Sequence, residues 1–131
     1  MKKILLMSVL VSGMLFAEGT VNPSQMKTMQ SLEEGMATVQ KGFLYNNENV
    51  VEKGIKEIKE RLTDVDSFLI KNEEDKKFNA PAYAATETAA IAKLVDEMGE
   101  AYKDGKKEEA LEAYSKTLSR CVVCHKVIRK W

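Results

Sequence analysis

The chain has 131 residues, the length of one domain, and its 20 basic residues balance its 20 acidic residues. No basic run stands out and aromatic residues make up only 7% of the chain, so a nucleic-acid partner is not expected. Glycine and proline are sparse, and long stretches consist of good helix formers such as Ala, Glu, Lys, Leu and Met. This composition favours an all-α protein.

The first 17 residues have the pattern of a secretory signal peptide. Two lysines precede the apolar run Ile4 to Phe16, and Ala17 is a small residue suited to the cleavage site. The apolar run has about 13 residues, whereas a membrane-spanning helix needs about 20, so an uncleaved anchor is the weaker interpretation. We therefore expect residues 1–17 to be removed and residues 18–131 to form the mature domain.

Two amphipathic helices are predicted in the first half of that domain. The pair Asn-Pro at 22–23 is a helix start signal, and the polar run 46–49 separates the two helices, with Asn49 as a candidate cap for the second. Gly35 and Gly42 permit the close approach of a neighbouring helix or a cofactor. Apolar residues alternately three and four positions apart mark the buried faces, at Met29, Leu32, Met36, Val39 and Phe43, and then at Val51, Ile55, Ile58, Leu62, Val65 and Leu69.

Two further helices are predicted after a polar link at 72–81. The third helix is expected to begin between Ala82 and Thr86 and to stop at Gly105, since glycine favours helix C-termini. The buried faces are expected at Ala84, Thr88, Ile91, Val95, Met98 and Tyr102, and then at Leu111, Tyr114, Leu118, Cys121, His125 and Ile128. Four such segments with connecting links predict an antiparallel four-helix bundle.

Near the C-terminus, Cys121, Cys124 and His125 form the pattern Cys-x-x-Cys-His. This is the attachment pattern for c-type haem, because each thiol can form a thioether with one vinyl group and the histidine can bind iron as the proximal ligand. The residues lie in or beside the apolar face of the segment 111–128, which predicts one covalently bound haem c in the core near the C-terminal end of the fourth helix. His125 is the only histidine, so another histidine cannot bind the second axial position.

Three other interpretations of the two cysteines are weaker. A structural zinc site needs four protein ligands, and two Cys and one His are the whole supply. A thioredoxin-like dithiol belongs where a strand meets a helix, and no strand is predicted. A Cys121–Cys124 disulfide suits an exported protein but gives no reason for His125 to follow. Haem c is attached outside the bacterial inner membrane, so export is consistent with the motif and the periplasm is the expected location.

A single haem motif near the C-terminus of a fourth helix resembles the class II c-type cytochromes, the cytochrome c′ family. The resemblance covers the whole mature chain and includes Arg129, since the family often has a basic residue four positions after the haem histidine; it usually has an aromatic residue where this chain has Ile128. The resemblance implies a haem at one end of the bundle, with its second axial side facing the first helix. Met29 is then the candidate sixth ligand, with Met26 as the second choice. Arg129 is a candidate partner of a haem propionate or of the proximal histidine.

The sequence therefore predicts a periplasmic monohaem c-type cytochrome that carries single electrons between redox partner proteins. The alternative is a five-coordinate cytochrome c′ that binds nitric oxide or carbon monoxide beside Met29 or Leu32, and a third interpretation is a haem-free helical protein with a disulfide. Enzymatic activity is not expected, since no second histidine is present as a base and no glycine-rich phosphate loop occurs. The resemblance alone suggests a homodimer.

Overall fold

The computed structural model describes residues 22–65 and 78–129. Within these ranges the chain has four helices and no strand: α1 (Pro23–Leu44), α2 (Glu48–Val65), α3 (Ala80–Lys103) and α4 (Lys107–Arg129). The all-α class with four helices is therefore confirmed. The expected signal peptide and the predicted core residue Leu69 lie outside the described residues. None of the described helices has the length and apolar character needed to cross a membrane.

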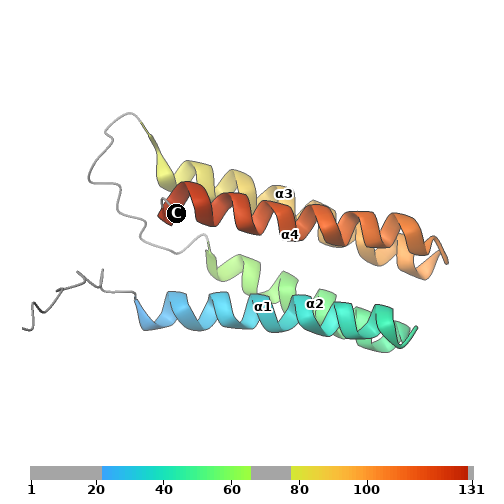
Figure 1. Ribbon diagram of the computed structural model, residues 1–131. Coiled ribbons are helices and arrows are strands. Elements are labelled where there is room, and N and C mark those ends of the chain that lie inside the picture. The colour runs from blue at the N-terminus through green and yellow to red at the C-terminus, as the bar shows by residue number, and fades with distance from the viewer. Residues whose placement is uncertain (1–21, 66–77, 130–131) are drawn as a thin grey trace, which may run out of the picture.

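The four helices form two antiparallel hairpins, α1–α2 and α3–α4, which pack together through α2 and α3 (Figure 1). Each helix runs opposite to the one before it, so the start of α1 and the end of α4 lie at the same end of the molecule (Figure 1). This arrangement is compatible with the predicted antiparallel bundle. Among the described residues, α1 and α4 have few or no close backbone contacts, and their ribbons are farther apart at this end in Figure 1 than at the other.

Local hydrogen bonds explain two predicted helix boundaries. The Asn22 side chain accepts a hydrogen bond from the backbone N–H of Ser24 at 2.9 Å, which caps α1. Pro23 begins the helix, where a missing N–H leaves no hydrogen bond unmade. Gly105 has a φ of 74° and follows the last residues of α3, so the predicted glycine stop is confirmed.

The start of α2 differs from the prediction. The side chain of Asn47, not that of Asn49, caps the helix by accepting the backbone N–H of Val50 at 3.2 Å. The reason is the tightness of the turn: Asn46 has a φ of 48°, a left-handed conformation that asparagine tolerates well. The chain reverses at this residue, so the next residue can already cap α2.

The start of α3 also differs, because it precedes the predicted range of 82–86. Asn79 accepts the backbone N–H of Ala82 at 3.0 Å, and the helix begins at Ala80. Pro81 therefore lies in the first turn of α3 rather than in the preceding link. Proline is tolerated in a first turn because the first N–H groups of a helix have no partner within it.

The core confirms most of the predicted apolar faces of α1, α2 and α3. It extends over these three helices and part of α4, and its buried members are Met36, Val39, Val51, Ile58, Leu62, Ile91, Val95, Met98, Tyr102, Ala110 and Ala113. At the end opposite the start of α1, the ring of Phe43 stacks on Tyr102 and contacts the edge of Tyr114. These rings connect α1 with both α3 and α4.

The predicted apolar face of α4 is wrong at two positions. Leu111 and Leu118 are 54% and 47% exposed, whereas the buried residues of α4 are Ala110, Ala113 and Thr117. One residue changes the direction of a helical side chain by about 100°, so these leucines lie beside the buried face rather than in it. The buried face consists of small residues because α4 packs closely against α3.

Candidate functional site

Cys121, Cys124 and His125 lie within about one turn near the C-terminal end of α4. Positions three and four apart share one side of a helix, and three residues advance the backbone by about 4.5 Å. The structure leaves all three side chains partly buried, and both cysteines are free thiols. Cys121 also packs against the core cluster. The two thiols and the imidazole therefore lie close together on α4, at the edge of the core.

Both thiols are protonated at neutral pH. Desolvation raises the pKa of Cys121 above its ordinary value, and the neighbouring Cys124 adds to this effect. Desolvation also raises the pKa of Cys124, with a further contribution from the negative charge of Glu87. Partial burial thus keeps the pair in the neutral form.

The environment of His125 favours the neutral imidazole. Desolvation lowers the pKa of His125, and the positive charge of Arg129 one turn later lowers it further. A neutral imidazole has a free nitrogen lone pair, which metal coordination requires. The prediction that Arg129 binds a haem propionate stays a prediction.

The start of α1 lies at the same end of the molecule and carries the two candidate methionines (Figure 1). Met29 is partly buried, whereas Met26 is 48% exposed. The next residue of the predicted α1 face, Leu32, packs against the core. Met29 therefore lies near the start of α1, partly buried, next to the buried Thr28 and three residues before Leu32.

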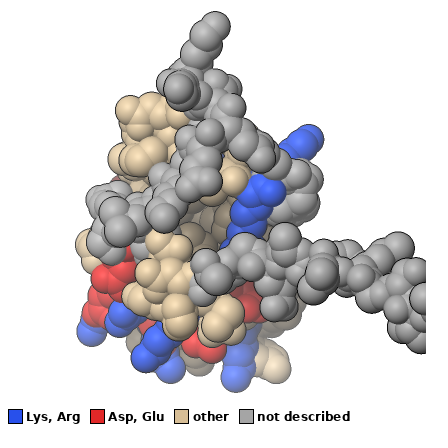
Figure 2. Space-filling view, turned by 90° about the vertical axis from the view of Figure 1, so that its left-hand side faces the viewer, with Lys and Arg blue, Asp and Glu red and all other residues tan. Residues whose placement is uncertain are grey.

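The end of α4 leaves apolar side chains uncovered. Beyond Thr117, no described residue of α4 is fully buried. Leu118, Val122, Val123 and Val127 are large apolar residues that remain exposed there. Figure 2 looks onto this end, and among the described residues visible there the charged side chains gather mainly along the lower edge. Apolar surface of this kind beside two thiols and a neutral imidazole fits a covalently held porphyrin, whose ring is itself apolar.

An ion pair next to the motif was not predicted from the sequence. Arg120 Nη1 on α4 donates a hydrogen bond to Glu87 Oε2 on α3 at 2.9 Å. The Glu87 side chain is only 13% exposed, whereas that of Arg120 is 45% exposed. One signal was present in the sequence: Glu87 follows Ala84 by three positions and precedes Ile91 by four, so it interrupts a predicted apolar face with a charge.

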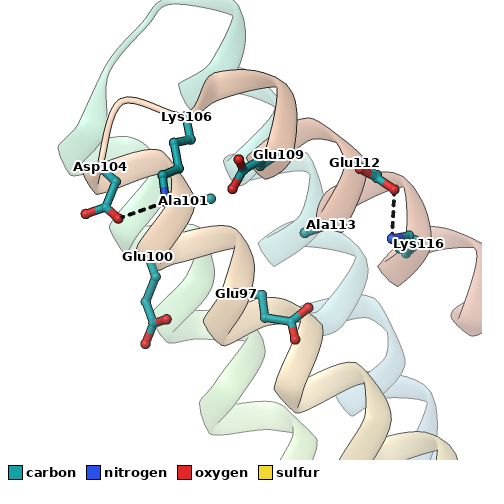
Figure 3. Close-up of a pocket in the computed structure, with 9 residues that line it drawn as sticks. All are labelled: Glu97, Glu100, Ala101, Asp104, Lys106, Glu109, Glu112, Ala113 and Lys116. Carbon is teal, nitrogen blue, oxygen red and sulfur yellow. Dashed lines mark ion pairs between the residues drawn. The ribbon is translucent and has the colours of Figure 1, made fainter.

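A groove between α3 and α4 is the other notable surface feature. Five carboxylates and two lysines line it together with Ala101 and Ala113, and the lysines form ion pairs with Asp104 and Glu112 (Figure 3). No group of three or more His, Cys, Asp and Glu side chains in the described ranges is arranged to hold a metal ion. A haem iron takes four ligands from the porphyrin, so it does not require such a group.

Comparison with protein-family models, with curated proteins and with solved structures found no match to this chain. The features that bear on function are therefore the chain's own: the four helices of the described ranges, the Cys-x-x-Cys-His motif and the partly covered apolar end of α4.

Proposed function

We propose that this protein is a periplasmic monohaem c-type cytochrome that carries single electrons between redox partner proteins. The observation that supports the proposal is the placement of Cys121, Cys124 and His125 within about one turn of α4, partly buried, at the end shared with the start of α1. Haem c, when bound, supplies one-electron chemistry between ferric and ferrous iron. The site would then accept one electron from a reduced donor protein and pass it to an oxidised acceptor, without forming or breaking a bond to substrate.

Each side chain of the site has a defined role in this proposal. The sulfur atoms of Cys121 and Cys124 would hold a haem covalently against a single turn of α4. His125 would bind the iron through its neutral imidazole. Apolar residues of α4 such as Leu118 and Val122 would exclude water from the bound haem, and a lower local dielectric constant would strengthen the effect of nearby charges on the iron.

Met29 is the proposed second protein ligand of the iron. Its thioether would favour ferrous iron and so raise the reduction potential, which suits an electron carrier. Met29 is partly buried and lies near the start of α1, at the same end of the molecule as Cys124 and His125. Met26 is the weaker candidate because its side chain is more exposed. The five-coordinate alternative requires an apolar side chain in place of a ligand, and Leu32 is the candidate for that role.

The proposal is tested by expressing the full chain in a bacterium that has the haem c attachment system. We expect a soluble periplasmic fraction containing a chain cleaved after Ala17, with one haem that stays bound after denaturation. Sharp absorbance bands in the reduced protein that do not change with carbon monoxide are expected for six-coordinate iron. The variant Cys121→Ala, Cys124→Ala is expected to lose the covalent haem.

Two outcomes would contradict the proposal. A wild-type chain without covalent haem under these conditions would favour the disulfide interpretation of Cys121 and Cys124. Broad bands that shift with carbon monoxide would show an open axial position, and the gas-binding cytochrome c′ function would replace electron transfer.

A further inference from the structure

We infer that Glu87 is a positioning residue that lowers the reduction potential of the haem site and, with Arg120, holds α4 in place beside Cys124. This inference rests on the proposed haem function. It goes beyond that function because it assigns the control of the potential to an ion pair that lies outside the attachment motif.

The first support is the geometry of the pair. The contact between Arg120 Nη1 and Glu87 Oε2 at 2.9 Å joins α3 to α4 across the interface of the hairpin. Arg120 directly precedes Cys121 and lies one turn before Cys124, so the two side chains Arg120 and Cys124 share a side of α4. The pair therefore fixes the helix at the turn where the haem would be attached.

The second support is the unequal burial of the two charges. The Glu87 side chain is 13% exposed, whereas solvent reaches 45% of the Arg120 side chain. Water screens an exposed charge more strongly than a buried one, so the carboxylate has the larger field inside the protein. Its charge also raises the pKa of the Tyr83 phenol, one turn earlier on α3, although desolvation is the larger cause.

The consequence follows from elementary electrostatics. Ferric haem has one more positive charge than ferrous haem, so a buried negative charge near the ring edge favours the ferric form. The field of Glu87 therefore lowers the reduction potential. Because Arg120 partly compensates this field, loss of the Glu87 charge and loss of the Arg120 charge are expected to change the potential in opposite directions.

The test measures the reduction potentials of haem-loaded wild type, Glu87→Gln and Arg120→Gln. Glu87→Gln keeps the size of the side chain and removes its charge, and we expect the equilibrium constant for reduction to rise about threefold, or about 28 mV at 59 mV per tenfold change for one electron. Arg120→Gln leaves the carboxylate uncompensated and is expected to change the constant in the other direction by a smaller factor, because the exposed Arg120 charge is screened more strongly.

A matched control is available at the other end of the bundle. Glu52 and Lys103 form an ion pair between α2 and α3 at 2.8 Å, and both side chains are about half exposed. Glu52→Gln is therefore expected to leave the potential unchanged. Shifts in the same direction for Glu87→Gln and Arg120→Gln would overturn the inference, as would a shift for Glu87→Gln no larger than that for Glu52→Gln.

A second measurement uses the haem-free chain. Glu87→Gln and Arg120→Gln are both expected to lower the urea midpoint of unfolding, because each removes one charge of the contact that joins α3 to α4. Glu52→Gln is the control and is expected to change the midpoint less, since both side chains of its ion pair are about half exposed. Unchanged midpoints for both Glu87→Gln and Arg120→Gln would overturn the inferred role of the pair in holding α4. A wild-type chain that binds no haem would overturn the proposed function and this inference together, whereas a loaded chain with unmoved potentials would overturn the inference alone.

Discussion

At the scale of single residues, partial burial controls the chemistry of the attachment motif. Desolvation raises the pKa of both cysteine thiols and lowers that of His125, so all three groups are neutral near pH 7. A neutral imidazole suits the iron coordination proposed for His125, and protonated thiols resist oxidation. The positive charge of Arg129 supports the neutral state of His125 from one turn away.

The axial ligand provides a prediction at this scale. Met29→Ala is expected to remove the proposed sixth ligand, so that the reduced bands broaden, carbon monoxide changes the spectrum and the reduction potential falls. Absorbance spectra of the two oxidation states, with and without carbon monoxide, measure this change. Met26→Ala is the matched control and is expected to keep the wild-type spectrum. A spectrum altered by Met26→Ala alone would assign the ligand to Met26 instead.

At the scale of the helices, glycine determines how closely α1 and α2 approach. A Cβ atom added to Gly54 would lie 2.7 Å from the backbone nitrogen of Val39 and 2.8 Å from the carbonyl oxygen of Gly35. A Cβ added to Gly42 would lie 2.7 Å from the backbone nitrogen of Val51. The sequence left open whether Gly35 and Gly42 accommodate a helix or a cofactor, and the structure shows α2 beside both of them.

Substitution of these glycines tests that close approach. Gly54→Ala is expected to lower the free energy of unfolding by about 1–3 kcal/mol, because backbone atoms must move apart and the overpacking outweighs alanine's better helix propensity. Gly99→Ala is the matched control, since its Cβ would meet only the flexible end of Ile55 at 3.0 Å. That variant is expected to be unchanged or more stable by up to about 1 kcal/mol. Urea unfolding of the two variants measures the difference, and equal stabilities would contradict the close packing.

At the scale of the whole molecule, the two ends of the bundle are held together differently. The rings of Phe43, Tyr102 and Tyr114 connect α1, α3 and α4 at one end. The Lys107 ammonium lies over the Tyr102 ring at 3.1 Å from its centroid, which adds a cation–π contact there. At the other end, the described part of α4 beyond Thr117 has no fully buried residue. A bound ring is therefore expected to add apolar contacts to the end of α4.

The contribution of haem to stability is the prediction at this scale. Haem-free Cys121→Ala, Cys124→Ala is expected to melt at least about 5 °C below the haem-loaded wild type, which corresponds to roughly 1 kcal/mol for a domain of this size. Circular dichroism at increasing temperature measures the midpoints. Haem-free wild type is the control for the substitutions themselves and is expected to melt with the variant. Equal midpoints for all three samples would show that the ring adds no stability.

Local patterns in the sequence were sufficient to predict four helices and most of the core. Alternating apolar spacing, the Asn22 cap and the Gly105 stop act within a few residues, so they can be recognised without a tertiary structure. The Cys-x-x-Cys-His motif is equally local, because its residues lie within one turn of a single helix. These features determined the fold class and the hypothesis of a haem site.

Only the tertiary structure decided which side of α4 is buried, since that depends on the approach of α3 rather than on α4 alone. Small residues, Ala110, Ala113 and Thr117, occupy the interface, and the larger Leu111 and Leu118 lie at its edge. The ion pair between Glu87 and Arg120 likewise joins residues that are 33 positions apart. No periodicity within one helix specifies the partner of a charge on another, because that pairing depends on how the two helices are placed in space.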